Sequence, residues 1–185
     1  MKIAVVNKKG GSGKTPISGL LALELNAYIF TNEANILESF FKDYMFIAPA
    51  DELPDLNESI VYDFGGFIDK GILKIIEKCN IVLIPVNNEY DALKKTIETI
   101  DEIEKINQNI IIIATKTEGK DYDIIKQNID SSYPIIELKK SKIFSNFTST
   151  GKRFDELVNE NALSKTTYAS INKQWNELLL TIQEL

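Results

Sequence analysis

A glycine-rich segment near the start of the chain has the residue types that bind phosphate. It reads Lys8-Lys9-Gly10-Gly11-Ser12-Gly13-Lys14-Thr15 and follows an apolar run over residues 3–7. Glycines let successive backbone N–H groups face one point, and a helix that follows adds the positive end of its dipole. In the pattern G-x-x-x-x-G-K-[ST] the lysine reaches the β- and γ-phosphates and the hydroxyl contacts Mg²⁺, the roles expected of Lys14 and Thr15. Lys8 replaces the first glycine, so the segment is a variant of that pattern.

A glycine-rich turn that only caps a helix is the alternative interpretation. At ordinary glycine frequencies, the specified positions would occur together by chance on the order of 10⁻⁵ times in a chain of this length. Pro16 falls in the first turn of the expected helix, where the missing N–H costs little. The residues therefore favour a phosphate loop.

Seven short β-branched runs alternate with helix-period segments and would place this loop at the edge of a sheet. The expected strands span residues 3–7, 27–31, 45–48, 59–63, 80–86, 109–115 and 134–138, and the expected helices span 13–26, 67–78, 91–106, 121–130 and 167–185. Several runs are almost continuously apolar, which is typical of parallel strands covered on both faces. The alternation predicts an α/β fold with a three-layer, doubly wound, mostly parallel sheet. Ligands bind outside the carboxyl ends of such strands.

Length and composition limit the classes of protein that fit. The 185 residues, 44% hydrophobic and 26% charged, predict a single globular domain over residues 1–185. The lack of histidine excludes imidazole bases and His-ligated metals. The single cysteine, Cys79, excludes a disulfide framework within one subunit, predicts a reducing cytoplasmic location, and is itself expected to be a small core residue. No apolar run approaches the roughly 20 residues that span a bilayer.

The segment from Lys9 to Thr15 resembles the deviant Walker A box of the ParA/MinD ATPases, and the resemblance covers nearly the whole chain. A lysine ahead of the glycines, here Lys9, defines that family and reaches the partner subunit's phosphates in an ATP-bound sandwich dimer. The resemblance implies that the chain binds ATP or ADP with Mg²⁺ and forms a homodimer with ATP. A cation that arrives only on dimerisation stabilises charge on the transferred phosphoryl group. The implied nucleotide-binding residues are Lys9, Gly10, Gly11, Ser12, Gly13, Lys14, Thr15 and Pro16.

Two later strand ends resemble further nucleotide contacts of the family. Asp63 ends the strand over residues 59–63, where the family has an aspartate that holds Mg²⁺ through water and senses the γ-phosphate. Gly65 and Gly66 stand in place of the usual prolines, and the alternative is an aspartate that only finishes a strand before a turn. Thr115 and Lys116 resemble the strand end beside the base, although an ordinary strand terminus would read the same way.

The main departure from the family follows the second strand. Where the family has Asp-x-Asp, with the second acid orienting the attacking water, this chain reads Thr31-Asn32-Glu33. Glu33 keeps a carboxylate there on a longer side chain, and a misplacement of about 1 Å can cost roughly 100-fold in rate, so slow hydrolysis is expected. The alternative is that Glu33 starts a helix over residues 33–41. The resemblance thus implies Lys9, Lys14, Glu33 and Asp63 as catalytic residues and Thr15 and Asp63 as metal contacts.

The charge distribution bears on nucleic-acid binding. A net charge of −6 argues against a DNA-binding surface, but residues 139–153 contain five basic residues and no acid: Lys139, Lys140, Lys142, Lys152 and Arg153. ParA relatives carry basic residues in the C-terminal third that bind DNA nonspecifically once ATP has paired the subunits. A solvated lysine face is the alternative. Phe144 and Phe147 are expected to be core anchors.

The last expected helix carries an apolar stripe that could contact a membrane or the core. The positive charge of Lys173 is outnumbered by the negative charges of Glu177 and Glu184, so the helix is not expected to be attracted to anionic lipid. Core packing is therefore the favoured interpretation, and no membrane contact is expected.

Together these features predict an ATP-dependent, dimerising ATPase that binds DNA nonspecifically, associates with the nucleoid, and drives plasmid or chromosome partition with a centromere-binding partner protein. One alternative is an ATP-switched positioning or scaffold protein of the same fold for a non-DNA cargo, with weak hydrolysis. Another is a metabolic ligase or kinase of the wider fold, such as a dethiobiotin-synthetase-like enzyme, and Lys9 argues against it.

Overall fold

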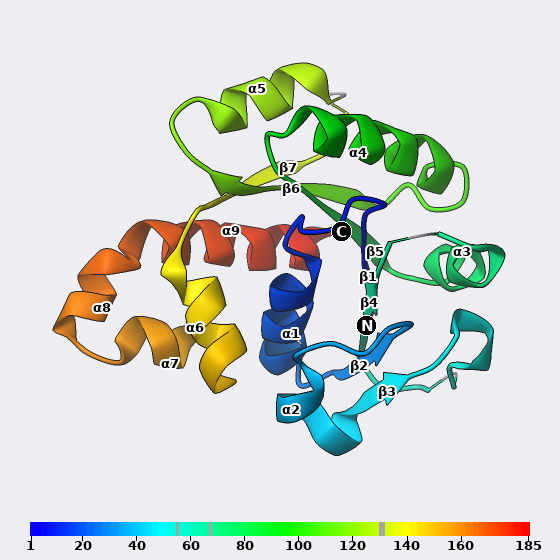
Figure 1. Ribbon diagram of the computed structural model, residues 1–185, viewed down its shortest axis with the longest axis horizontal. Helices are drawn as coiled ribbons and strands as arrows, with labels where there is room; N and C mark the ends of the chain where they lie inside the picture. The colour runs from blue at the N-terminus through cyan, green and yellow to red at the C-terminus, as the bar shows by residue number, and fades with distance from the viewer. Residues whose placement is uncertain (55, 67, 130–131) are drawn as a thin grey trace.

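A parallel sheet runs through the middle of the computed structural model, which describes residues 1–54, 56–66, 68–129 and 132–185 (Figure 1). Within these residues the sheet has seven strands in the order β3-β2-β4-β1-β5-β6-β7, and every pairing is parallel. The strands are β1 (Lys2–Val6), β2 (Tyr28–Thr31), β3 (Met45–Ile47), β4 (Ile60–Phe64), β5 (Ile81–Val86), β6 (Ile110–Thr117) and β7 (Ile135–Lys139). The predicted α/β fold and each of its predicted strands are confirmed.

The helices that alternate with the strands also lie close to their predicted positions. They are α1 (Lys14–Leu25), α3 (Lys70–Glu77), α4 (Tyr90–Ile103), α5 (Asp121–Asn128) and α9 (Ala169–Glu184). Two residues of the predicted helices, Phe67 and Asp130, lie outside the described residues. A short helix α2 (Glu38–Phe41) falls within the helix that was the alternative interpretation for residues 33–41. The prediction missed the 3₁₀ turns η1 (Lys42–Tyr44) and η2 (Ala50–Glu52) and the helices α6 (Lys142–Thr150), α7 (Phe154–Asn159) and α8 (Ala162–Thr167).

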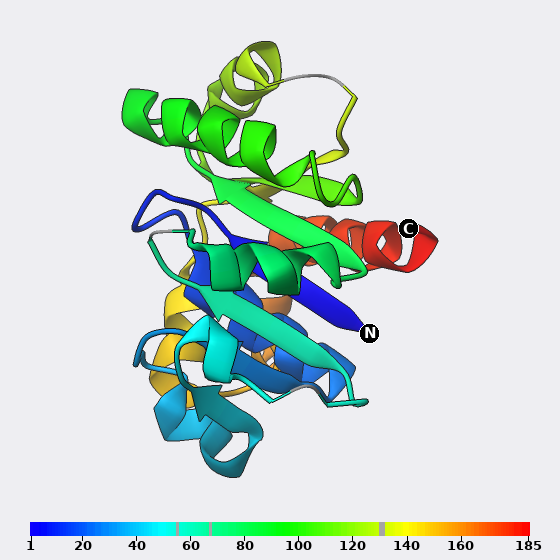
Figure 2. The same cartoon turned by 90° about the vertical axis from the view of Figure 1, so that its right-hand side faces the viewer.

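The sheet separates two hydrophobic cores, because side chains alternate between its faces along each strand. On β1, Ile3 and Val5 pack into the core that α1, α6, α7 and α9 share. Ala4 and Val6 pack into the other core, with η2, α3, α4 and α5. Figure 2 shows α3 and α4 in front of the strands, with α1 and α9 behind. The predicted three-layer arrangement is therefore confirmed.

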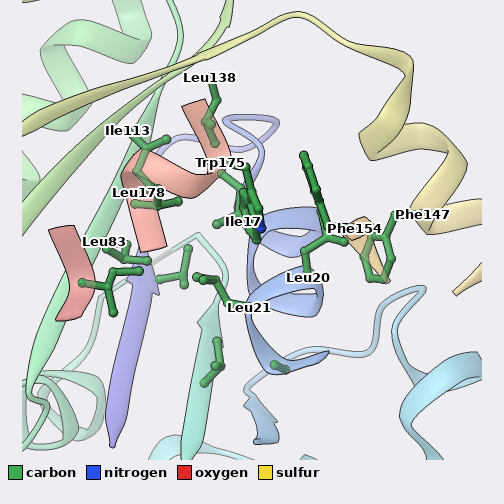
Figure 3. Close-up of a cluster of buried hydrophobic side chains, with 14 of the residues drawn as sticks. Ile17, Leu20, Leu21, Leu83, Ile113, Leu138, Phe147, Phe154, Trp175 and Leu178 are labelled. Carbon is green, nitrogen blue, oxygen red and sulfur yellow. The ribbon is translucent and has the colours of Figure 1, made fainter. Parts of the chain in front are cut away.

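The first core centres on a ring stack between two segments far apart in the sequence (Figure 3). Trp175 of α9 is 1% exposed and stacks on Phe154 with ring centroids 4.9 Å apart. The buried face of α9 also includes Leu178 and Ile182, which confirms that the apolar stripe packs in the core. Phe147 is buried in the same core, and Phe144 packs against it, as predicted. Within the described ranges no helix is long and apolar enough to cross a bilayer.

Cys79 lies in the second core, at the carboxyl end of α3. It is buried, and burial raises the pKa of its thiol to about 12. The predicted role as a small core residue is confirmed, because a thiol in these surroundings is neutral at physiological pH.

The centre of the sheet gathers the segments that follow four strands. β1 lies between β4 and β5, with Val5 opposite Asp63 on one side and Leu83 on the other. On β2, Thr31 lies opposite Asp63 as well. Since the strands are parallel, the loop after β1 meets the ends of β2, β4 and β5 at one edge of the sheet.

Candidate phosphate-binding site

The loop between β1 and α1 has a backbone that glycine makes possible. Gly11 and Gly13 adopt φ values of 75° and 95°, in the left-handed region that other residues rarely enter. Gly13 is also the N-cap residue of α1, and no side chain caps that helix. The N–H groups of the first turn of α1 are therefore available to an anion, as the sequence pattern predicts.

Lys14 turns its side chain back into the loop. Its Nζ donates hydrogen bonds to the carbonyl oxygens of Asn7 at 3.1 Å and Lys9 at 3.0 Å. Burial lowers the pKa of this ammonium group, while the carboxylates of Asp63 and Glu33 raise it. Lys14 is thus a buried cation at the mouth of the loop, with two carboxylates nearby. Its ammonium group is placed to contact a phosphate bound in the loop as well as these carboxylates.

Asn7 holds the loop in place, although no motif pointed to it. Its Nδ2 donates to the carbonyl oxygen of Pro85 and to Oγ1 of Thr96, both at 2.8 Å, and its Oδ1 accepts the N–H of Lys9 at 2.9 Å. The side chain is fully buried. A polar residue at the end of an apolar strand was the signal in the sequence, because a buried amide needs hydrogen-bond partners.

The structure brings Asp63 and Thr15 together, as predicted for the metal contacts. Asp63 accepts hydrogen bonds from the hydroxyl of Thr15 and from Ser18 Oγ at 3.0 Å. Burial raises the pKa of its carboxyl, and these hydrogen bonds and the charge of Lys14 lower it in part. Asn35, which the sequence did not single out, donates from Nδ2 to the second carboxylate oxygen at 3.1 Å.

This donor set fits a magnesium ion that is bound mainly by a phosphate ligand. The described residues include no cluster of three or more acidic, cysteine or histidine side chains that would bind a metal on their own. Mg²⁺ commonly takes only one or two protein ligands and completes its octahedron with phosphate oxygens and water. One hydroxyl and one carboxylate, from Thr15 and Asp63, match that requirement.

Glu33 lies at the same edge of the sheet and does not start a helix. The alternative interpretation, a helix over residues 33–41 that starts at Glu33, holds only for its second half, because α2 begins at Glu38. The Glu33 carboxylate instead lies against Gly65, so closely that a Cβ on residue 65 would overlap it. Asn32 accepts the N–H of Gly65 on its Oδ1 at 3.0 Å. The segments after β2 and β4 are therefore joined next to Asp63.

Lys9 is held on its own subunit. Its Nζ lies 3.1 Å from Asp91 Oδ2 and 3.8 Å from Glu89 Oε2, at the start of α4. Its neighbour Lys8, which replaces the first glycine of the usual pattern, pairs with Glu102 of the same helix at 2.7 Å. Lys8 and Lys9 thus both contact acids of α4 or the residue before it, whereas the third lysine of the loop, Lys14, points inward.

Thr115 and Lys116 lie beside the loop. Thr115 donates to the carbonyl oxygen of Ser12, and Lys116 donates from Nζ to that of Gly11, both at 2.8 Å. Together with Pro16 and Phe144 they line a cavity of about 370 Å³. Cavities of this size hold small ligands, and this one adjoins Gly13 and Pro16 at the end of the loop.

The basic segment is largely neutralised by acids from other parts of the fold. Lys140 pairs with Glu118 at 3.1 Å, Lys152 with Glu160 at 2.7 Å and Arg153 with Glu24 at 3.7 Å. Lys139 lies 3.9 Å from Glu137, and Lys142 has no ion pair with any described residue. The fold thus places acids from outside the segment beside four of its five cations, and the predicted DNA contacts stay a prediction.

Comparisons with known proteins identify solved structures that share this architecture. No protein-family model and no curated protein matches the sequence. Among solved structures, MinD from Pyrococcus horikoshii, complexed with Mg-ADP, aligns over 96% of both chains with a TM-score of 0.64 and 13% identity. Apo McdA from Cyanothece aligns over 99% of this chain and 98% of its own, with a TM-score of 0.67 and 15% identity.

A third solved structure is a putative plasmid partition protein from Borrelia burgdorferi bound to AMPPNP. It aligns over 95% of this chain and 98% of its own, with a TM-score of 0.63 and 12% identity. Similarity at such low identity establishes architecture and not activity. The chain therefore has the fold of the MinD, McdA and ParA-family ATPases.

Proposed function

We propose that this protein is an ATPase of the ParA/MinD type that dimerises with ATP. The observation that carries the proposal is the loop itself, in which Lys14 and Thr15 lie next to Asp63 and a second lysine, Lys9, precedes the glycines. The nucleotide complexes among the structural neighbours support it: P. horikoshii MinD binds Mg-ADP, and a Cyanothece McdA variant binds ATP.

Each part of the reaction has a candidate residue. The loop N–H groups and Lys14 would hold the phosphates, and the cavity beside Thr115 and Lys116 would take the base. Thr15 and Asp63 would hold Mg²⁺, which would neutralise charge on the phosphates. Glu33 orients the attacking water, and the partner subunit's Lys9 stabilises charge on the transferred phosphoryl group.

We further propose that the ATP-bound dimer binds DNA nonspecifically and drives plasmid or chromosome partition with a centromere-binding partner protein, in the cytoplasm and on the nucleoid. The residues Lys139, Lys140, Lys142, Lys152 and Arg153 would supply the contacts. A dimer places two copies of this segment on one assembly, so binding would be weak for monomers and strongly dependent on salt. The plasmid partition protein among the neighbours supports this assignment.

A second candidate is an ATP-switched positioning protein for a cargo other than DNA. The ion pairs of the basic segment favour it, because Lys140, Lys152 and Arg153 already have acidic partners within the subunit. Each exposed pair must be broken before its cation can contact a phosphate, which reduces the gain from binding DNA.

The test is the rate of ATP hydrolysis and the affinity for ATP, measured with and without DNA. We expect Lys14→Ala to lose ATP binding, and Lys9→Ala to bind ATP but to lose dimerisation and turnover. Lys94→Ala, on the exposed side of α4, is the matched control and should behave as the wild type. A turnover rate that does not depend on Lys9 would refute the trans role of this lysine. Failure of the wild type to bind Mg-ATP would refute the function.

DNA binding is tested separately by gel shift at low salt. The expected result is a shift with ATP that Lys152→Gln combined with Arg153→Gln weakens. A shift that is absent with ATP, or that ignores these substitutions, would leave the positioning function as the conclusion.

A further inference from the structure

A groove of about 640 Å³ lies away from the phosphate loop, on the face of the sheet opposite α1. One wall is α3 and the other is the segment of residues 50–54, which includes η2; Figure 2 shows α3 and η2 on the same side of the sheet. Between the two walls, Tyr62 of β4 lines the groove from the sheet. None of the residues proposed to bind nucleotide lines it.

Three lysines form a row along the α3 wall. Lys70, Lys74 and Lys78 line the groove at successive intervals of four residues, so they lie on one face of the helix about 6 Å apart. All three are exposed, and none forms an ion pair with any residue that the structure describes. This row differs from the basic segment of residues 139–153, where most cations already have acidic partners.

The groove as a whole is basic in an acidic protein. Its row of three lysines faces two aspartates, Asp51 and Asp69, in a chain of net charge −6; the fourth lysine of the lining, Lys2, already has an interaction of its own. Asp69 is already engaged as the N-cap of α3, where it accepts the N–H of Ile72 at 2.8 Å. The local excess of positive charge favours an acidic occupant.

The walls of the groove are already in contact beneath it. Gly71 of α3 is so close to η2 that a Cβ on it would lie 3.2 Å from Cβ of Ala50 and 3.4 Å from the backbone N of Asp51. The shape therefore comes from backbone packing and not from side chains that must first be ordered. A preformed groove lowers the entropic cost of binding an extended ligand.

We propose that this groove binds an extended acidic segment of a partner protein, with acids at alternate positions. Alternate side chains of an extended strand lie about 6.5 Å apart on one side, which matches the spacing of roughly 6 Å between the lysines. The intervening apolar side chains then point to the opposite side, toward the wall that includes Ala50 and Leu53.

Two other occupants fit less well. The row from Lys70 to Lys78 spans about 12 Å, longer than the convergent set of polar groups that fixes a small molecule. Single-stranded nucleic acid gains affinity by stacking its bases on aromatic side chains, but Tyr62 is 5% exposed and stacks on Phe64 with ring centroids 5.5 Å apart.

The experiment measures fluorescence anisotropy of a labelled peptide, Glu-Val repeated four times, with the full-length protein at low salt and without nucleotide. We expect binding that weakens roughly tenfold when Lys70, Lys74 and Lys78 are all changed to Gln, because an exposed ion pair contributes a factor of about 1.5 to 5. The matched control changes the exposed Lys105, Lys165 and Lys173 to Gln, which alters net charge equally and should leave the affinity within twofold.

Two further arms separate charge from shape. A peptide of Gln-Val repeats should bind at least tenfold more weakly, and Leu53→Asp, which places an acid in the apolar wall, should weaken binding of the Glu-Val peptide. Equal weakening by both lysine triples would overturn the proposal in favour of nonspecific attraction. Tighter binding of a single-stranded oligonucleotide than of the peptide would overturn it in favour of a nucleic-acid surface. Since the assay contains no nucleotide, its failure is distinct from failure of the ATPase function.

Discussion

The ammonium group of Lys9 forms an ion pair with Asp91 at the start of α4 of its own subunit, with Nζ and Oδ2 3.1 Å apart. Glu89, the residue before α4, lies 3.8 Å from the same ammonium group. Both acids are well exposed and the lysine is partly exposed. If Lys9 acts on the partner subunit, it must first leave these carboxylates, so the pair competes with dimerisation.

Removing this competition should favour the dimer. We expect Asp91→Asn to lower the dimer dissociation constant with ATP by a factor of about 1.5 to 5, the range that corresponds to an exposed ion pair of 0.2–1 kcal/mol. Sedimentation of the two proteins over a range of concentrations measures it. Asp101→Asn, an exposed position further along α4, is the control. A weaker dimer in Asp91→Asn would show that the acid supports the interface instead.

Gly65 leaves the space that the Glu33 carboxylate occupies. We expect Gly65→Ala to displace that carboxylate and reduce ATP turnover roughly 100-fold, as Glu33→Gln should, with ATP affinity little changed. The double variant should lose no more ATP turnover than either single variant, because both substitutions remove the same function, that of the Glu33 carboxylate. Glu38→Gln, exposed on α2, is the control in the turnover assay. Full additivity in the double variant would argue that Gly65 and Glu33 act separately.

The buried carboxyl of Asp63 makes stability depend on pH. Burial raises its pKa above the ordinary value of 3.8 in the folded protein, so folding favours the protonated form. The resulting stabilisation is present below about pH 4 and is lost as pH rises through the folded-state pKa. Asp63→Asn cannot ionise, so its stability relative to the wild type should increase between pH 4 and 7 in urea unfolding. The exposed Asp101→Asn should show no such trend, and a pH-independent difference for Asp63→Asn would contradict the assignment.

Glu160 pairs with Lys152 at 2.7 Å and so limits the positive charge of the basic segment. If the dimer binds DNA through this segment, Glu160→Gln should tighten binding about two- to fivefold and Lys152→Gln should weaken it. Anisotropy of a labelled duplex with ATP at low salt measures both changes. Glu104→Gln, at the end of α4, changes net charge equally and serves as the control. Equal tightening by both glutamate variants would indicate an effect of overall charge.

The stack of Trp175 on Phe154 joins α9 to α7 in the first core. Because Trp175 is 1% exposed, Trp175→Ala should lower the free energy of unfolding by about 3–5 kcal/mol. Urea denaturation measures the change. Leu180→Ala in the same helix removes a side chain that is 59% exposed and should change stability by no more than about 0.5 kcal/mol. Similar losses in both variants would mean that the stack does not organise this core.

The parts of the molecule that follow from local sequence were predictable. Apolar runs such as residues 110–113 mark buried parallel strands, since few other elements concentrate β-branched residues in this way. The phosphate loop was recognisable because its chemistry depends on neighbours in sequence, from Gly10 to Thr15. The helices α7 and α8 were missed because each has six residues, too few turns to show a clear period.

The parts of the site that were not predicted depend on contacts between residues that are far apart in the sequence. The basic segment contains no acid, and Glu118, Glu160 and Glu24 become its neighbours only through folding. Likewise, Asn35 contacts Asp63 across 28 positions of sequence, and the contact of Glu33 with Gly65 depends on the pairing of β2 with β4. A single sequence carries no signal for such pairs.

The central place of β1 has a consequence for how the protein is made. Ile3 pairs with Val61 on one side and with Ile81 on the other. The first strand to be synthesised therefore cannot complete its pairing until β4 and β5 have both been made. Asn7 then needs Thr96 before its amide is satisfied. A nascent chain that stops short of α4 therefore lacks the hydrogen bonds that hold the loop. If the loop binds nucleotide, chains truncated before α4 should bind it less well than the full chain, because Asn7 then lacks Thr96 as a partner.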